Sequence, residues 1–203
     1  MIPIIREQLL DTLNYFHDGG IVMLPLLLSS VLMWAMIINR MLYLGALEKY
    51  DIIRNEAKEY ILHDRLPDTG KYRGLRARFV SMFLKKRCGK SEIDQYILDE
   101  TVMSVNTMLD QYLAYIGVLA AVSPFFGLLG TVTGMMATFD IISVFGTGNA
   151  KAMAGGISEA LISTQTGLLV AIPGLYMHNL LLRKAGRLKQ RAASTGYYLR
   201  RFV

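Results

Sequence analysis

The chain has 203 residues, of which 53% are hydrophobic and 19% are charged, and its formal net charge is +6. This composition predicts an integral membrane protein with a modest polar part rather than a soluble globular domain. The only cysteine, Cys88, excludes an intramolecular disulfide, and we interpret it as an incidental cysteine within a basic stretch.

Residues 1–18 carry apolar side chains at steps of three and four: Ile5, Leu9, Leu13 and Phe16. This spacing predicts a short amphipathic helix at the outer membrane boundary, or alternatively an ordinary helical lead-in packed on its neighbours. Acidic residues stand where the basic region of a signal peptide would lie, so no cleavable signal is expected.

Three apolar segments are long enough to cross a bilayer: 19–39, 111–139 and 152–182. About 20 helical residues span the roughly 30 Å hydrocarbon core, and the first two segments contain no charged residue. The sequence therefore predicts an all-α membrane protein with three transmembrane helices.

The remaining segments predict long cytoplasmic helical extensions, residues 40–110 and 183–203. The first span is expected to continue as helix to Leu62, and a basic helix should follow over Tyr72–Arg87. Ser91 is expected to cap a helix that runs unbroken into the second span, and the third span should continue to the C-terminus. No strand pattern and no internal repeat are evident.

Every Lys and Arg except Arg6 and Lys151 lies between residues 40 and 90 or after Leu182. The positive-inside rule places those regions in the cytoplasm, and the N-terminus and the predicted 140–151 loop outside. Topology thus explains the net charge, and nucleic-acid binding is not expected. The basic run at residues 71–90 could instead meet anionic lipid headgroups.

Glu159 is the only charged residue between Ala152 and Leu182. A carboxylate at a transmembrane helix centre costs about 2.5–3.5 kcal/mol on insertion scales, so it usually faces protein, a pore or a partner. Glu159 therefore indicates a site in an ion path, with a paired structural carboxylate as the alternative.

Small residues recur along one face of the second and third spans, which predicts close helix packing in lipid. We assign this role to Gly127, Gly134, Gly156, Gly167 and Pro173. The hydroxyls on these helices either bond their own backbone or line a polar path. The candidates for a polar lining are Thr131, Thr138, Ser163 and Thr164.

Three spans leave small faces unfilled, so a homo-oligomer around an axis is expected, which would gather one Glu159 from each subunit into a ring. Enzyme motifs, zinc-ligand spacing and phosphate-binding glycine loops are missing from the sequence. We therefore expect no enzymatic activity, no cofactor and no metal.

Two stretches resemble the second- and third-span motifs of the MotA/TolQ/ExbB proton-channel family. They are Pro124-Phe-Phe-Gly-Leu-Leu-Gly-Thr-Val-Thr-Gly-Met-Met and Gly156-Ile-Ser-Glu-Ala-Leu-Ile-Ser-Thr-Gln-Thr-Gly-Leu-Leu-Val-Ala-Ile-Pro-Gly. Gly19-Gly20 at the start of the first span also suits the ExbB pattern. Three spans with the N-terminus outside fit the ExbB/TolQ branch of the family.

The resemblance implies a pentamer in the bacterial inner membrane, with a periplasmic N-terminus and a cytoplasmic C-terminus. It implies a dimer of a single-span ExbD- or TolR-like partner in the central lumen, and a TonB-like protein that receives the energy of proton flow. By motif match, Thr131 and Thr164 correspond to lumen-lining threonines, and Glu159 to the third-span glutamate.

The sequence-based interpretation is thus a channel-forming subunit of an ion-driven motor that energises transport across the outer membrane. A TolQ-like or other motor subunit of the same family is one alternative. A passive membrane scaffold that clamps single-span partners without ion flux is the other. A stand-alone secondary transporter is disfavoured, because three spans without an inverted repeat offer no alternating-access core.

Overall fold

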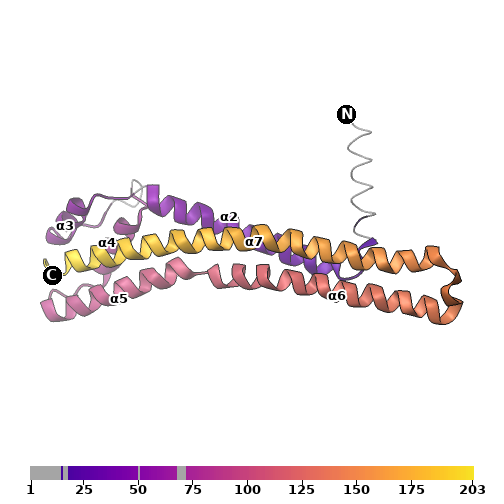
Figure 1. Ribbon diagram of the computed structural model, residues 1–203. Coiled ribbons are helices and arrows are strands. Elements are labelled where there is room, and N and C mark those ends of the chain that lie inside the picture. Colours follow the sequence, from indigo (N-terminus) through magenta and orange to yellow (C-terminus); the bar gives the residue numbers. More distant parts are fainter. Residues whose placement is uncertain (1–14, 16–17, 50, 68–71) are drawn as a thin grey trace, which may run out of the picture. The chain divides into compact units, whose positions relative to one another are not determined.

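The computed structural model describes residues 15, 18–49, 51–67 and 72–203. The amphipathic helix expected over residues 1–18 lies, apart from Tyr15 and Asp18, outside these residues and stays a prediction. No strand occurs in the described ranges. The helices are α2 (Met23–Lys49), α3 (Arg54–Leu62), α4 (Leu75–Lys86), α5 (Ser91–Asp110), α6 (Leu113–Phe145), the 3₁₀ turn η1 (Gly146–Gly148) and α7 (Ala150–Leu199) (Figure 1).

Three helical stretches are long and apolar enough to cross a membrane: Met23–Lys49, Ser91–Gly148 and Ala150–Leu199. The expected all-α membrane architecture with three candidate spans is confirmed. The ring assembly remains a prediction.

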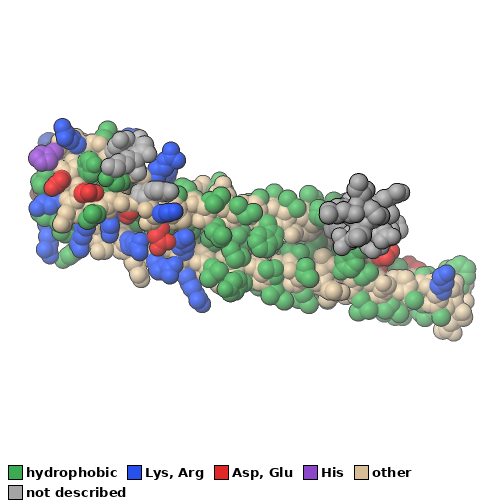
Figure 2. Space-filling model, turned by 90° about the horizontal axis from the view of Figure 1, so that it is seen from above, with side chains coloured by type: hydrophobic (Ala, Val, Ile, Leu, Met, Phe, Trp, Pro, Cys, Tyr) green, Lys and Arg blue, Asp and Glu red, His purple; other side chains and the backbone are tan. Residues whose placement is uncertain are grey.

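The chain divides into two compact units. The apolar unit comprises Met1–Met36 and Tyr115–His178, and the basic unit comprises Ile37–Ala114 and Asn179–Val203. Every Lys and Arg except Arg6 and Lys151 falls in the basic unit. Figure 2 shows hydrophobic side chains over the surface of the apolar unit and Lys and Arg side chains gathered over the basic unit.

In the apolar unit, α6 and α7 pack closely in opposite directions through small residues (Figure 1). A Cβ atom built on Gly134 would lie 2.6 Å from the carbonyl oxygen of Gly156, and one built on Gly167 would lie 3.0 Å from the Cα of Gly127. Large apolar side chains on the other faces of these helices remain exposed, which suits contact with lipid or with a second protein. They include Phe125, Leu128, Leu169 and Ile172.

The connection between α6 and α7 is shorter than the expected loop of residues 140–151. Helix α6 continues through Asp140 to Phe145, and α7 begins at Ala150. Apolar residues follow Asp140, and the first breaker is Gly146, which adopts a φ of +66°. Four residues therefore join the two helices.

The expectation that the first span continues as helix to Leu62 is wrong. Helix α2 ends at Lys49, and α3 starts at Arg54. Between them, the Asp51 carboxylate accepts hydrogen bonds from the backbone N–H groups of Ile52 (3.0 Å) and Arg76 (2.8 Å). An aspartate that bonds nearby backbone groups competes with helix formation. Asp51 therefore ends the helix and joins this turn to α4.

The expectation of an unbroken helix from Ser91 into the second span is also wrong. Helix α5 ends at Asp110, and α6 begins at Leu113, with Tyr112 at a φ of +64°. Arg40, which is only 2% exposed, donates from one guanidinium nitrogen to the carbonyl oxygens of Met108 (2.7 Å) and Leu109 (2.9 Å). Because Arg40 satisfies carbonyls at the end of α5, it stabilises the break.

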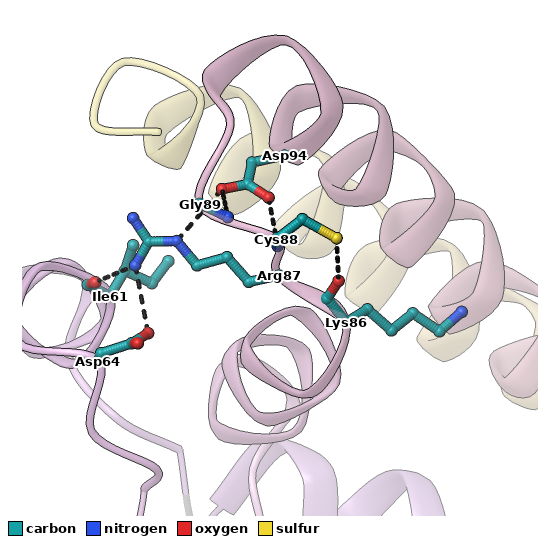
Figure 3. Close-up of polar contacts among 7 residues, drawn as sticks. All are labelled: Ile61, Asp64, Lys86, Arg87, Cys88, Gly89 and Asp94. Atoms are coloured by element: carbon teal, nitrogen blue, oxygen red, sulfur yellow. Dashed lines mark hydrogen bonds and ion pairs between the residues drawn. The ribbon is translucent and has the colours of Figure 1, made fainter.

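Asp94, rather than Ser91, provides the polar cap of α5. Ser91 is the first helical residue, and the N-cap is Lys90, which makes no side-chain cap. The buried Asp94 carboxylate accepts from the backbone N–H groups of Cys88 (2.8 Å) and Gly89 (3.1 Å) and from Arg87 Nε (3.3 Å) (Figure 3). Arg87 also donates to the carbonyl oxygen of Ile61 (2.9 Å), so one residue pair links α3, α4 and α5.

Candidate functional site

Glu159 lies in the apolar unit against the start of the first span. It is half-buried, and a Cβ atom built on Gly20 would overlap its Oε1. Gly20 has a φ of +72°, a conformation that other residues rarely adopt. Only a glycine here provides both this backbone turn and the room for the carboxylate.

The Glu159 carboxylate makes no hydrogen bond or ion pair with the described residues. Asp140 and Lys151, the nearest charged residues along the chain on α6 and α7, are exposed. A half-buried carboxylate within an apolar segment is costly unless it is protonated or receives a partner. The alternative interpretation, in which Glu159 is a structural carboxylate with a paired cation, therefore has no such cation in the described part of this chain.

Ser163 and Thr164 lie where α7 crosses α6. The Thr164 hydroxyl donates to the carbonyl oxygens of Ala160 (3.1 Å) and, across the interface, Gly127 (3.3 Å). The Ser163 hydroxyl is placed similarly, 3.0 Å from the Ala160 oxygen and 3.5 Å from that of Gly127. Ser163 is fully buried, whereas Thr164 is half-buried.

Thr131 and Thr138 both bond within α6. The Thr131 hydroxyl donates to the carbonyl oxygen of Leu128 (2.6 Å), and the Thr138 hydroxyl to that of Gly134 (3.0 Å). Thr138 is 3% exposed and lies against Gly156 of α7, whereas Thr131 is half-buried. Burial between α6 and α7 thus favours a packing role for Thr138 and Ser163, while Thr131 and Thr164 keep exposed surface.

The four glycines assigned to packing lie at the crossing of α6 and α7. Gly127 contacts Gly167, and Gly134 contacts Gly156. Pro173 lies half-buried inside α7, and the helix continues through it. The structure therefore brings the four glycines together in two pairs, with the hydroxyl groups between and beside them.

The chemistry available is that of one ionisable carboxyl beside hydroxyl groups. Each hydroxyl already donates to a backbone carbonyl, but its oxygen can still accept a hydrogen bond. Glu159 can hold or release a proton. The described residues include no group of three or more His, Cys, Asp or Glu side chains suited to a metal ion.

The sequence did not predict the roles of Gly20 at this site or of Arg40 in the basic unit. Gly20 was identified only as part of a glycine pair, and Arg40 only as one of the basic residues that indicate the cytoplasmic side. The available signal for Gly20 was a glycine directly before a helix whose partner span carries the lone carboxylate. For Arg40, it was a cation directly after an uncharged span, a position from which a long side chain reaches backbone carbonyls.

The fold and this site define a multi-pass helical membrane protein with a lone carboxylate in its third span. Comparison with protein families matches residues 71–194 to the MotA/TolQ/ExbB proton channel family. The chain belongs to this family.

Among the relatives, the biopolymer transport protein ExbB of Salmonella typhimurium is 37% identical over 101 residues. That match covers 50% of this chain and only 41% of the relative's length. ExbB of Helicobacter pylori is 39% identical over 50% of this chain and 69% of its own. A putative ExbB-like biopolymer transport protein of Synechocystis is 31% identical over 91% of this chain and 93% of its own.

Proposed function

We propose that this chain is the channel-forming subunit of an ion-driven motor in the bacterial inner membrane. It acts as a homo-pentamer around a dimer of a single-span ExbD- or TolR-like protein. Proton flow through this complex drives a TonB-like protein that energises transport across the outer membrane. The N-terminus is periplasmic and the C-terminus cytoplasmic. Membership of the proton channel family supports this proposal.

The observation that carries the proposal is that Glu159 makes no hydrogen bond or ion pair with the described residues. A carboxylate that lies against Gly20, without an ion-pair partner among the described residues, is suited to exchange a proton or to meet a residue of another chain. The large exposed apolar side chains on α6 and α7 offer the surface that such a chain would cover.

Thr131 and Thr164 line the ion route in this proposal, because both keep exposed surface and free acceptor capacity. Ser163 and Thr138 hold α6 on α7 and thereby fix where Thr164 and Thr131 stand. This division follows the burial of the four hydroxyls.

Proton flux tests the proposal. The chain is co-purified with its single-span partner, reconstituted into vesicles, and assayed with a pH-sensitive dye under an imposed potential. We expect Glu159→Gln and Thr164→Val to lower the flux at least about tenfold, which corresponds to about 1.4 kcal/mol in a barrier. Thr133→Val is the control: Thr133 lies on α6, but like Thr164 it is a half-buried threonine whose hydroxyl donates to its own helix, at Gly130 (3.1 Å). Its flux should match that of the unchanged protein.

A passive scaffold is the second candidate, favoured by one observation: Thr131, Thr138, Ser163 and Thr164 all donate to backbone carbonyls. Native mass spectrometry of the same preparation separates the two. A pentamer that retains two partner copies but gives no flux above empty vesicles would support the scaffold. A chain that neither oligomerises nor binds the partner would refute both.

A further inference from the structure

A pocket of about 310 Å³ in the basic unit is lined mainly by arginines. All of its lining residues belong to this unit, and none of them is acidic. They are Arg54, Arg76, Arg187, Gln190, Arg191, Ser194 and Thr195. Residues that carry guanidinium, amide and hydroxyl groups therefore line one open surface pocket.

Three helices bring these side chains together. Arg187, Gln190, Arg191 and Ser194 recur at three- and four-residue steps, so they share one face of α7. Arg54 is the first residue of α3, and Arg76 lies in the first turn of α4. A cation in the first turn faces the positive end of the helix dipole, which is its unfavourable end.

Carboxylates of the chain neutralise this charge only in part. Arg76 lies 3.8 Å from Asp51, and Arg191 lies 3.7 Å from a Glu48 carboxylate that also meets Lys184. Among the described residues, two of the four pocket arginines thus have a carboxylate partner, and one of these two carboxylates is shared with Lys184.

Two donors in the pocket have no partner in the part of the chain that the structure describes. Arg187 is exposed and makes no hydrogen bond or ion pair there. The Nε of Arg76 is buried and makes no hydrogen bond. The guanidinium carbon of Arg54 lies 4.0 Å from the ring centroid of Tyr198, and Arg54 makes no hydrogen bond with the described residues.

We propose that this pocket binds a phosphate-bearing anion. Converging guanidiniums repel one another unless an anion lies between them, and their planar forks match phosphate oxygens in pairs. Ser194 and Gln190 add neutral donors, and the volume is at the small end of ligand sites. The phosphate group belongs to an anionic phospholipid or to a soluble phosphorylated molecule.

The first arm of the test uses pyrophosphate as the probe. Thermal unfolding of the full chain, in an uncharged detergent, is followed against pyrophosphate and against potassium chloride of equal ionic strength. We expect pyrophosphate alone to raise the melting temperature. Arg187→Gln should weaken its apparent affinity about tenfold, and Arg187→Lys, which keeps the charge without the fork, by less. Since Arg187 has no partner among the described residues, both variants should fold.

The control is Arg65→Gln, an exposed arginine of the same unit outside this pocket, which should leave the affinity unchanged. The second arm uses native mass spectrometry after incubation in vesicles of phosphatidylglycerol or of phosphatidylcholine. Retained phosphatidylglycerol that Arg187→Gln loses identifies the lipid, and a response to pyrophosphate alone identifies a soluble ligand. If neither probe binds in an Arg187-dependent way, the proposal is overturned.

Discussion

Gly20 and Glu159 show how one residue type sets the position of another far along the chain. The hydrogen atom of Gly20 stands where any other residue would place a Cβ atom against the carboxylate. The same glycine turns the chain into α2 at a positive φ. The position of Glu159 therefore depends on two properties of Gly20, its conformation and its size.

Substituting Gly20 should separate these two properties. We expect Gly20→Ala to lower the free energy of unfolding by about 1–3 kcal/mol, because it combines backbone strain with overlap on Glu159. Gly146→Ala is the matched control: Gly146 has a similar φ of +66° but open space around a built Cβ. Thermal unfolding in detergent measures both. Equal losses would mean that strain alone matters and that the Glu159 contact does not.

Asp51 gives the basic unit a pH-dependent stability. Burial raises the pKa of this carboxyl above its ordinary value of 3.8, more than its hydrogen bonds and Arg76 lower it. The folded state therefore holds the proton more tightly than the unfolded chain does. The resulting contribution to stability is fully present below pH 3.8 and is lost as the pH rises through the folded-state pKa.

Asp51→Asn should test this sign. Asparagine keeps an acceptor oxygen for the N–H groups of Ile52 and Arg76 but carries no charge. We expect the variant to be more stable than the unchanged protein at pH 7, because it avoids burying a charged carboxylate. The difference should shrink as the pH falls towards 4 in thermal unfolding series. A difference that does not vary with pH would contradict the raised pKa.

At the residue scale, the lone carboxylate was evident from the sequence, whereas its surroundings were not. Glu159 stands out because charge is rare in an apolar segment. Its contact with Gly20 depends on how two segments separated by more than a hundred residues pack. The same holds for the arginine pocket, whose members look like scattered surface charges until α3, α4 and α7 converge.

At the scale of elements, the crossing of α6 and α7 depends on backbone proximity. A Cβ on Gly156 would overlap Thr138 Oγ1 and lie 2.7 Å from the carbonyl oxygen of Gly134. We expect Gly156→Ala to destabilise the protein by about 1–3 kcal/mol, because the helices must separate to admit the methyl group. Thermal unfolding in detergent provides the measurement.

Gly155→Ala is the control for this substitution, since Gly155 is the adjacent residue of α7 and a built Cβ there meets nothing within 4 Å. Alanine is a better helix former than glycine by about 1 kcal/mol, so Gly155→Ala should be neutral or stabilising. If both substitutions had the same effect, the close contact would not contribute to stability.

The sequence predicts which segments are helical. It predicts where a helix ends only where neighbouring residues in the chain determine that end. Gly146 ends the α6 turn by its own conformation. The breaks at Asp51 and at Tyr112 depend instead on Arg76 and Arg40, which approach from other elements. Likewise, α5 begins as a helix near Ser91 as predicted, but Asp94 provides its cap.

At the scale of the whole molecule, the charge division predicts how the chain lies in the membrane. Cys88 is the only cysteine, is exposed, and belongs to the basic unit. We expect a membrane-impermeant thiol reagent to modify Cys88 only after cells are broken open, because the positive-inside rule places this unit in the cytoplasm.

A cysteine introduced in the apolar unit tests the other side of the membrane. In a Cys88→Ser background, Lys151→Cys places the only thiol at the start of α7, in the apolar unit, at an exposed position. This variant should react in intact spheroplasts. Modification of Cys88 in intact cells, or protection of position 151, would reverse the predicted orientation.

The four residues between α6 and α7 have a consequence for the alignment of these helices. Their contact faces repeat small side chains about once per turn, so a slide of one turn, about 5.4 Å, would again set small residues opposite small ones. Such a helix pair can pack in more than one register. The short connection Gly146–Asn149 restricts α6 and α7 to one register. A longer connection would remove this restriction. The protein would then have two competing registers of α7, the helix that carries Glu159.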